Sequence, residues 1–139
     1  LLGPAHERPW DLELAGDPRT FADLATPEGL EVIDEYADGI AAVKELILPR
    51  DIRDDVGVAS SLVRDAHRRG LTVHVWTLRA ENIFLPIGLR RGDDPSALGD
   101  LAGEVRAFLA AGVDGVITDQ PDVAVAVAQP AEGDRHQAS

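Results

Sequence analysis

Residues 70–82 read Gly-Leu-Thr-Val-His-Val-Trp-Thr-Leu-Arg-Ala-Glu-Asn, and this stretch decides the fold. Side chains of two kinds alternate along its first half, which predicts a β-strand. One face carries the aliphatic residues Leu71, Val73 and Val75 and suits a sheet packed under helices. The other face carries Thr72, His74 and Trp76. Charged residues follow where the strand should end, so we expect this segment to form one wall of a binding pocket.

The segments on either side of this strand alternate between helix and strand patterns. Thr26-Pro27-Glu28 predicts a helix start, because it combines a hydroxyl cap, a proline at the first helical position and an acidic first turn. Apolar residues at helical spacing predict further helices over 58–70, 98–112 and 121–128. Short apolar runs predict strands over 38–43 and 113–119, with residues 1–3 as the candidate tail of another. We expect loops at 46–53 and 83–96, a mostly irregular segment at 1–25 and a flexible tail at 129–139.

Strands that alternate with helices form parallel sheets, so the fold class is α/β. Short strands followed by polar residues and long loops are typical of a (β/α) barrel, in which these loops build the site. A barrel needs eight such units, and the chain carries roughly three or four. Half a barrel leaves strand edges unpaired, so we expect the isolated chain to be marginally stable or to self-associate.

The composition is that of a globular domain. The chain has 139 residues, of which 45% are hydrophobic and 27% charged. Its formal net charge of −12 argues against binding to nucleic acid or to an anionic membrane surface. The absence of cysteine excludes disulfides, thiolate chemistry and cysteine-ligated metals. No apolar run is long enough to predict a membrane span.

Methionine is also absent, including at position 1. We therefore expect the chain to begin after a cleavage or to be an internal piece of a longer protein.

Five sequence segments, in this order, resemble the C-terminal half of glycerophosphodiester phosphodiesterases. They are YADGI (36–40), Lys44, LPRD (48–51), DAHRRGLTVHVWTLRAEN (65–82) and GVDGVITDQPD (112–122). The resemblance covers roughly residues 24–128 and is greatest to the secreted or periplasmic bacterial branch of the family. It implies that residues 1–128 are the C-terminal half of a TIM (β/α)8 barrel. It also suggests a periplasmic or extracellular location.

The resemblance further implies a reaction, the hydrolysis of glycerophosphodiesters to glycerol 3-phosphate and an alcohol with a divalent cation, Ca²⁺ or Mg²⁺. The family's catalytic histidines and most of its metal ligands lie in the first half of the barrel. The histidines of this chain do not match those positions; they are His6, His67, His74 and His136. We therefore expect no catalytic residue and no metal ligand in this chain. Ala41-Ala42 and Ile117 also depart from the family pattern, and the first departure puts the loop after residues 38–43 in doubt.

Four residues are candidate substrate contacts. Trp76 matches an aromatic family position expected to line the pocket, where its ring would contact a polyol, and a core role is the alternative. His74 could hydrogen-bond a ligand or the metal site, and a satisfied interior histidine is the preferred alternative. Lys44 could bind phosphate or be solvated. Arg79 could bind phosphate through its guanidinium fork or form a structural ion pair with Glu81 or Asp119.

Two other functions remain open at this point. A complete, non-catalytic half-barrel would self-associate or bind a partner through its open edges. A different phosphate-handling barrel would release no glycerol 3-phosphate, since the fold alone does not fix the chemistry.

Overall fold

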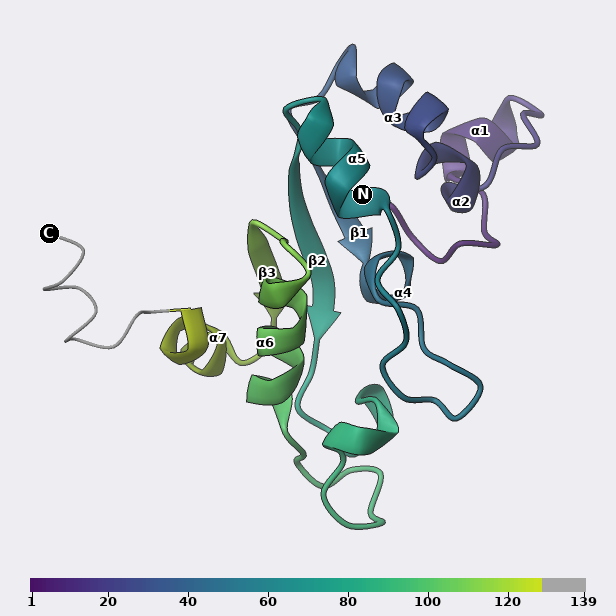
Figure 1. Cartoon of the computed structure of the whole chain (residues 1–139). Helices are drawn as coiled ribbons and strands as arrows, with labels where there is room; N and C mark the ends of the chain where they lie inside the picture. Colours follow the sequence, from purple (N-terminus) through teal and green to yellow (C-terminus); the bar gives the residue numbers. More distant parts are fainter. Residues whose placement is uncertain (129–139) are drawn as a thin grey trace, which may run out of the picture.

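A three-stranded parallel sheet forms the centre of the computed structural model, which describes residues 1–128 (Figure 1). Its strands are β1 (Gly39–Val43), β2 (Thr72–Leu78) and β3 (Gly115–Thr118), in the order β1-β2-β3. Both pairs are parallel, and Ala41, His74 and Gly115 stand side by side across the sheet. The predicted strands and their parallel pairing are confirmed. The tail at 129–139, expected to be flexible, lies outside the described residues.

Four helices follow the pattern expected from the sequence. Helix α3 (Pro27–Asp34) begins as predicted, because the Thr26 hydroxyl accepts a hydrogen bond from Gly29 N at 3.1 Å. The others are α5 (Leu62–Arg68), α6 (Leu101–Ala110) and α7 (Pro121–Ala128). Gly70 and Gly112 follow α5 and α6 with φ of +74° and +98°, a backbone region that glycine enters without steric cost.

The predicted starts of two helices are wrong. Val58 and Leu98 were assigned to helical stripes, but they are 88% and 66% exposed and precede the helices. Asp100 caps α6 instead, because its carboxylate accepts a hydrogen bond from Gly103 N at 2.9 Å. An apolar residue at helical spacing is therefore not enough to extend a helix past a strong cap.

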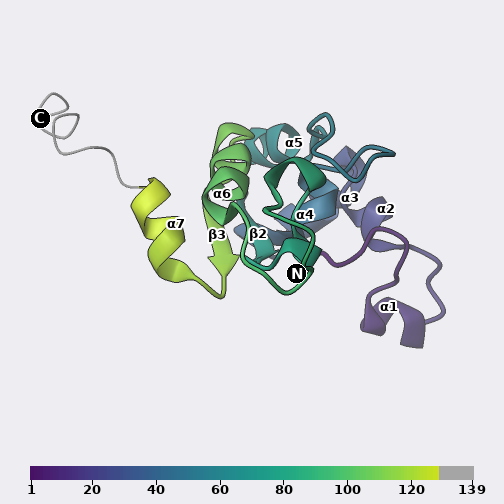
Figure 2. The ribbon, with the colours of Figure 1, turned by 90° about the horizontal axis from the view of Figure 1, so that it is seen from below.

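In the part of the chain that the structure describes, helices cover one face of the sheet and leave the other face open. Helices α5 and α6 contact β2, and α3 packs on α5 on the same side (Figure 2). The aliphatic face of β2 lies beneath these helices, and Leu71, Val73 and Val75 are fully buried there, as predicted. Burying each such side chain contributes about 1.5–3 kcal/mol. The opposite face carries Thr72 and His74, which are exposed, and Trp76, which is half-buried.

The N-terminal segment is more regular than expected. Residues 1–25 were predicted to be mostly irregular, and most of them lie outside helices and strands. Two short helices in this segment, α1 (Trp10–Leu14) and α2 (Phe21–Leu24), were not predicted. Thr20 and Asp23 form a capping box that starts α2. Leu2 forms a parallel bridge to Ala42, with Leu2 N donating to Ala41 O at 2.7 Å. The candidate strand tail at residues 1–3 is thus confirmed as an extension of the sheet beside β1.

The two predicted loops contain short helical turns. The short helix α4 (Lys44–Ile47) occupies the start of the first, and the 3-10 turns Asn82–Phe84 (η1) and Ile87–Leu89 (η2) lie in the second. Both loops lie at the end of the sheet where β1 and β2 finish (Figure 1). Among residues 1–128, no helix has the length and apolarity needed to cross a membrane.

Candidate functional site

The open face of the sheet meets two loops at its carboxyl end, and this junction is the candidate site. In parallel sheets the residues at and beyond the carboxyl ends of the strands build binding sites. The loop of residues 48–57 follows β1 and α4, and the loop of residues 79–100 follows β2. Trp76 and Arg79 lie at this end, and His74 lies two residues before Trp76 on β2.

Trp76 lies on the open face and reaches across to the neighbouring strand. Its indole Nε1 donates a hydrogen bond to Ala41 O at 3.0 Å, which fixes the ring against β1. The ring is half-buried and stands on the side of the sheet opposite the helical core. This placement suits a pocket wall, and contact with a substrate stays a prediction.

His74 differs from the preferred expectation of a satisfied interior histidine. Its side chain is exposed on the open face and has no hydrogen bond within residues 1–128. The ring covers Gly115 of β3, where an added Cβ would lie 2.6 Å from the ring. His74 is therefore not enclosed by the described residues, because none of their helices covers its side of the sheet.

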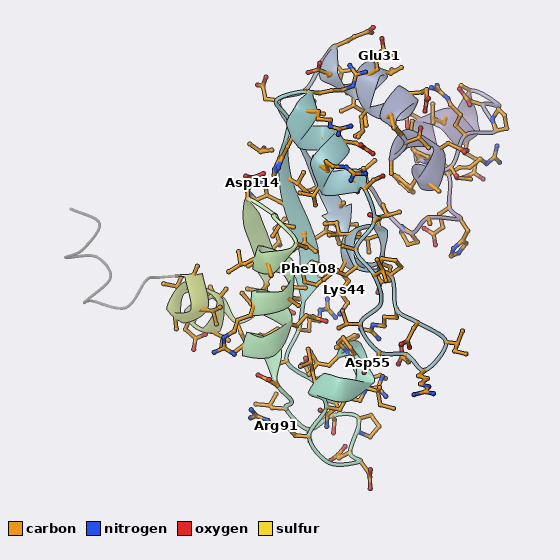
Figure 3. The ribbon with its side chains drawn as sticks, in the orientation of Figure 1. Glu31, Lys44, Asp55, Arg91, Phe108 and Asp114 are labelled. Carbon is orange, nitrogen blue, oxygen red and sulfur yellow. The ribbon has the colours of Figure 1, made fainter. Side chains whose placement is uncertain are left out.

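Lys44 is buried, so the alternative of a solvated lysine is wrong. It is 8% exposed and lies 3.2 Å from the carboxylate of Glu104, which is 2% exposed (Figure 3). Its ammonium also donates to Phe84 O. Burial lowers the pKa of Lys44 and raises the pKa of Glu104, and their attraction opposes both shifts. Phosphate binding by Lys44 stays a prediction, and it requires this ammonium to exchange Glu104 for the substrate.

Arg79 has a structural ion pair of the kind expected. Its Nε lies 3.1 Å from the carboxylate of Asp119, which follows β3. Its guanidinium also lies 5.1 Å from the centre of the Phe84 ring. Both side chains of the ion pair are about half exposed to solvent, and phosphate binding by Arg79 stays a prediction.

A second ion-pair network joins the two loops. Asp54 accepts hydrogen bonds from Arg50, at 3.0 Å, and from Arg90. These contacts lower the pKa of Asp54, with the hydrogen bond from Arg50 as the first cause. The neighbouring Asp55 carboxylate accepts from Gly88 N at 3.2 Å. Asp54 and Asp55 therefore bind the loop of residues 48–57 to the loop of residues 79–100.

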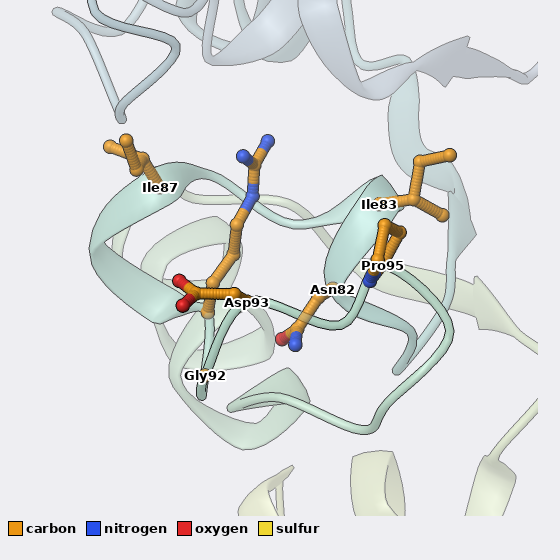
Figure 4. Close-up of a pocket in the computed structure, with 7 residues that line it drawn as sticks. Asn82, Ile83, Ile87, Gly92, Asp93 and Pro95 are labelled. Carbon is orange, nitrogen blue, oxygen red and sulfur yellow. The ribbon is translucent and has the colours of Figure 1, made fainter.

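The loop of residues 79–100 lines an open pocket of about 450 Å³ (Figure 4). Its lining combines isoleucine and proline side chains with polar groups: Asn82, Ile83, Ile87, Arg90, Gly92, Asp93 and Pro95. Asn82 is 2% exposed, and its amide nitrogen donates to Arg91 O and Asp94 O at 2.8 and 2.9 Å. Asn82 therefore holds the loop closed. None of the four predicted substrate contacts lines this pocket.

Residues 1–128 offer no group of three histidine, cysteine or acidic side chains that could hold a metal ion. His67 pairs with Asp114 at 2.8 Å, at the end of the sheet opposite Lys44 (Figure 3). His6 is exposed in the N-terminal segment, and His136 lies outside the described residues. The side chains of this part of the chain therefore do not fit a divalent cation.

Sequence reasoning missed the partners that fix the site. Glu104 lies 60 residues after Lys44, and its only signal was an acidic residue inside an apolar helix pattern. Asn82 was noted only as a polar residue after a strand. No pattern in the sequence predicts that an aspartate of the 48–57 loop contacts Arg90.

Comparisons with known proteins agree on one family. A family model described as "Glycerophosphoryl diester phosphodiesterase family" matches residues 7–123. A curated protein from Arabidopsis thaliana, "Glycerophosphodiester phosphodiesterase GDPD6", is 36% identical over 67 residues. That match covers 48% of this chain and 18% of the Arabidopsis protein, so the chain spans less than a fifth of that relative's length.

Proposed function

The chain belongs to the glycerophosphoryl diester phosphodiesterase family, and from this membership we propose that it is the C-terminal part of an enzyme that hydrolyses glycerophosphodiesters to glycerol 3-phosphate and an alcohol. The observation that carries the proposal is the family match over residues 7–123. It includes all three strands and the polar residues at their carboxyl ends. In this proposal the sheet is the C-terminal half of a (β/α)8 barrel, and its open face is turned to the barrel interior.

Each candidate contact has a role in this scheme. Trp76 presents an aromatic face to the carbon skeleton of the substrate. Arg79 uses guanidinium N–H groups that Asp119 leaves available to bind a phosphate oxygen. His74 lies on the same face and contacts the ligand or residues around the cation. Lys44 binds phosphate only after leaving Glu104.

Catalysis and metal binding are assigned to the part of the protein outside this chain. Residues 1–128 do not fit a divalent cation, so no step of the reaction is assigned to Ca²⁺ or Mg²⁺ held by these residues. When bound, such an ion stabilises charge that develops on the phosphate. The contribution of this chain is to bind, orient and enclose the substrate.

The test is an assay of glycerol 3-phosphate release by the full-length protein with and without a chelator. We expect release from glycerophosphodiesters, and its loss on chelation. Trp76→Ala should lower kcat/KM while the melting temperature changes little, because the ring lies outside the helical core. Val125→Ala, an exposed residue of α7, is the matched control. Unchanged kcat/KM with a large fall in melting temperature would assign Trp76 to the core.

A second candidate is a non-catalytic half-barrel that self-associates. The open sheet face favours it, because Ile117 of β3 is 43% exposed there. The absence of glycerol 3-phosphate release by the longest native form of the protein would favour this alternative.

A further inference from the structure

Two acceptor oxygens near the candidate site have no donor among the described residues. Oε2 of Glu81 and Oε1 of Gln120 are buried from solvent, and neither has a hydrogen-bond partner within residues 1–128. A buried acceptor without a donor costs free energy, and the cost is greater for a carboxylate. Such groups are rare in folded proteins and require an explanation.

Both residues lie just past the carboxyl ends of paired strands. Glu81 is three residues beyond Leu78, the last residue of β2, and Gln120 is two residues beyond Thr118, the last of β3. The strand ends are joined, because Thr118 Oγ1 donates to Leu78 O at 2.6 Å. The ion pair of Arg79 joins the same two segments one residue further on. The two acceptors therefore belong to one corner of the candidate site.

The backbone directs Glu81 away from the helical core. Leu78, Ala80 and Asn82 are buried, whereas Arg79 is exposed and Glu81 partly exposed. Glu81 also forms an antiparallel bridge to Leu98, so this stretch remains extended. Alternation along an extended segment places Arg79 and Glu81 on the same side.

We propose that Glu81 and Gln120 accept hydrogen bonds from the hydroxyl groups of a glycerol phosphate unit whose phosphate binds Arg79. This inference rests on the proposed function and names the residues that recognise the alcohol part. Arg79 and Glu81 are two residues apart on an extended segment, so their Cα atoms are about 6.6 Å apart. A three-carbon alcohol phosphate has about this length. A hydroxyl donor satisfies a lone acceptor, whereas Ca²⁺ requires more oxygen ligands than these two side chains supply.

The test compares two monoesters with the same carbon skeleton, glycerol 3-phosphate and n-propyl phosphate. Isothermal titration calorimetry with the full-length protein gives both dissociation constants. We expect glycerol 3-phosphate to bind at least about tenfold more tightly, as hydrogen bonds to a charged acceptor predict. Glu81→Met should bring the ratio of the two dissociation constants close to one without weakening the binding of n-propyl phosphate. Gln120→Leu should reduce the ratio in part, and Glu45→Met, an exposed glutamate after β1, should leave it unchanged.

The melting temperature of the ligand-free Glu81→Met variant distinguishes a binding role from a structural role, because the two roles predict changes of opposite sign. Glu81→Met removes a buried, unpaired carboxylate oxygen, so the melting temperature should rise. A fall of several degrees would show that Glu81 has a partner within the folded protein, and would overturn the proposal. Equal binding of the two monoesters by the wild-type protein would also overturn it. Binding of neither monoester would count against the proposed function itself.

Discussion

At the residue scale, the buried pair of Lys44 and Glu104 joins α4 to α6 and holds the loop that carries Phe84. We predict that Lys44→Met lowers the free energy of unfolding by about 3–5 kcal/mol at neutral pH, because Glu104 then remains buried without a partner. Burial raises the pKa of Glu104, so this loss should shrink as the pH falls and the carboxyl takes up a proton. Urea unfolding of the full-length protein at several pH values measures both effects.

The double variant Lys44→Met/Glu104→Leu is the matched control for that prediction. Replacing both charges by apolar side chains of similar size should recover most of the lost stability, because no buried charge is left unpaired. A loss of stability by the double variant that equals or exceeds the loss by Lys44→Met would contradict this account.

Asp114 gives the fold a dependence on acidic pH. Its carboxylate accepts a hydrogen bond from Val73 N at 2.7 Å and lies 2.8 Å from His67 Nε2. Both contacts lower the pKa of Asp114 below its value in the unfolded chain, and the hydrogen bond with His67 is the larger cause. A lowered folded pKa stabilises the protein above the unfolded pKa, and this stability is lost as the pH falls through the folded pKa.

We therefore predict that Asp114→Asn destabilises the protein at pH 6 and has a much smaller effect below the folded pKa of Asp114. Urea unfolding from neutral to strongly acidic pH compares the two proteins. Asp122→Asn, an exposed aspartate of α7, should change the profile little. If the free energy of unfolding of Asp114→Asn differs from that of the wild type by the same amount at every pH, the effect comes from the change in side-chain structure and not from the loss of charge.

At the scale of elements, Asp54 joins the loops of residues 48–57 and 79–100 through Arg90, and it also pairs with Arg50 of its own loop. Its φ is +62°, a region that asparagine also tolerates, so Asp54→Asn removes the charge without adding backbone strain. We predict faster amide hydrogen exchange at Ile87 and Gly88, which donate to Asp54 O and to the Asp55 carboxylate. Global stability should fall by less than about 1 kcal/mol, because these ion pairs are partly solvated.

Hydrogen exchange followed by mass spectrometry measures this loosening. The matched control is Asp93→Asn, an exposed aspartate that lines the pocket of the same loop. It should leave exchange at Ile87 and Gly88 unchanged. If both variants behave alike, the loops are held together by their backbone contacts and not by Asp54.

Local signals predicted some elements well, and distant contacts explain where prediction failed. The hydroxyl and proline of Thr26-Pro27 and the alternation in residues 71–76 act within a few residues, so α3 and β2 were located correctly. The capping box of Thr20 and Asp23 was also a local signal, and it was overlooked beside three nearby prolines. The partners of Lys44 and Arg79 lie 60 and 40 residues away, and only the packed fold shows that the first is buried and the second is not.

At the scale of the whole molecule, the open sheet face requires a covering. Ile117 is 43% exposed on β3, and His74 is exposed beside it on β2. In the proposed barrel this face is turned inward, so the remaining strands would close the sheet around it. Residues 1–128 alone do not supply that closure, and they expose apolar surface to water.

We therefore predict that the isolated 139-residue chain self-associates at micromolar concentration, whereas the full-length protein does not. Size-exclusion chromatography with light scattering measures both masses. Ile117→Lys should weaken self-association, because it adds a charge to the open face. Val58→Lys, at a position that is 88% exposed and away from the sheet, should not. A monodisperse monomer with a sharp cooperative melt would show that three strands and their helices are stable without a covering on this face, and would contradict the prediction.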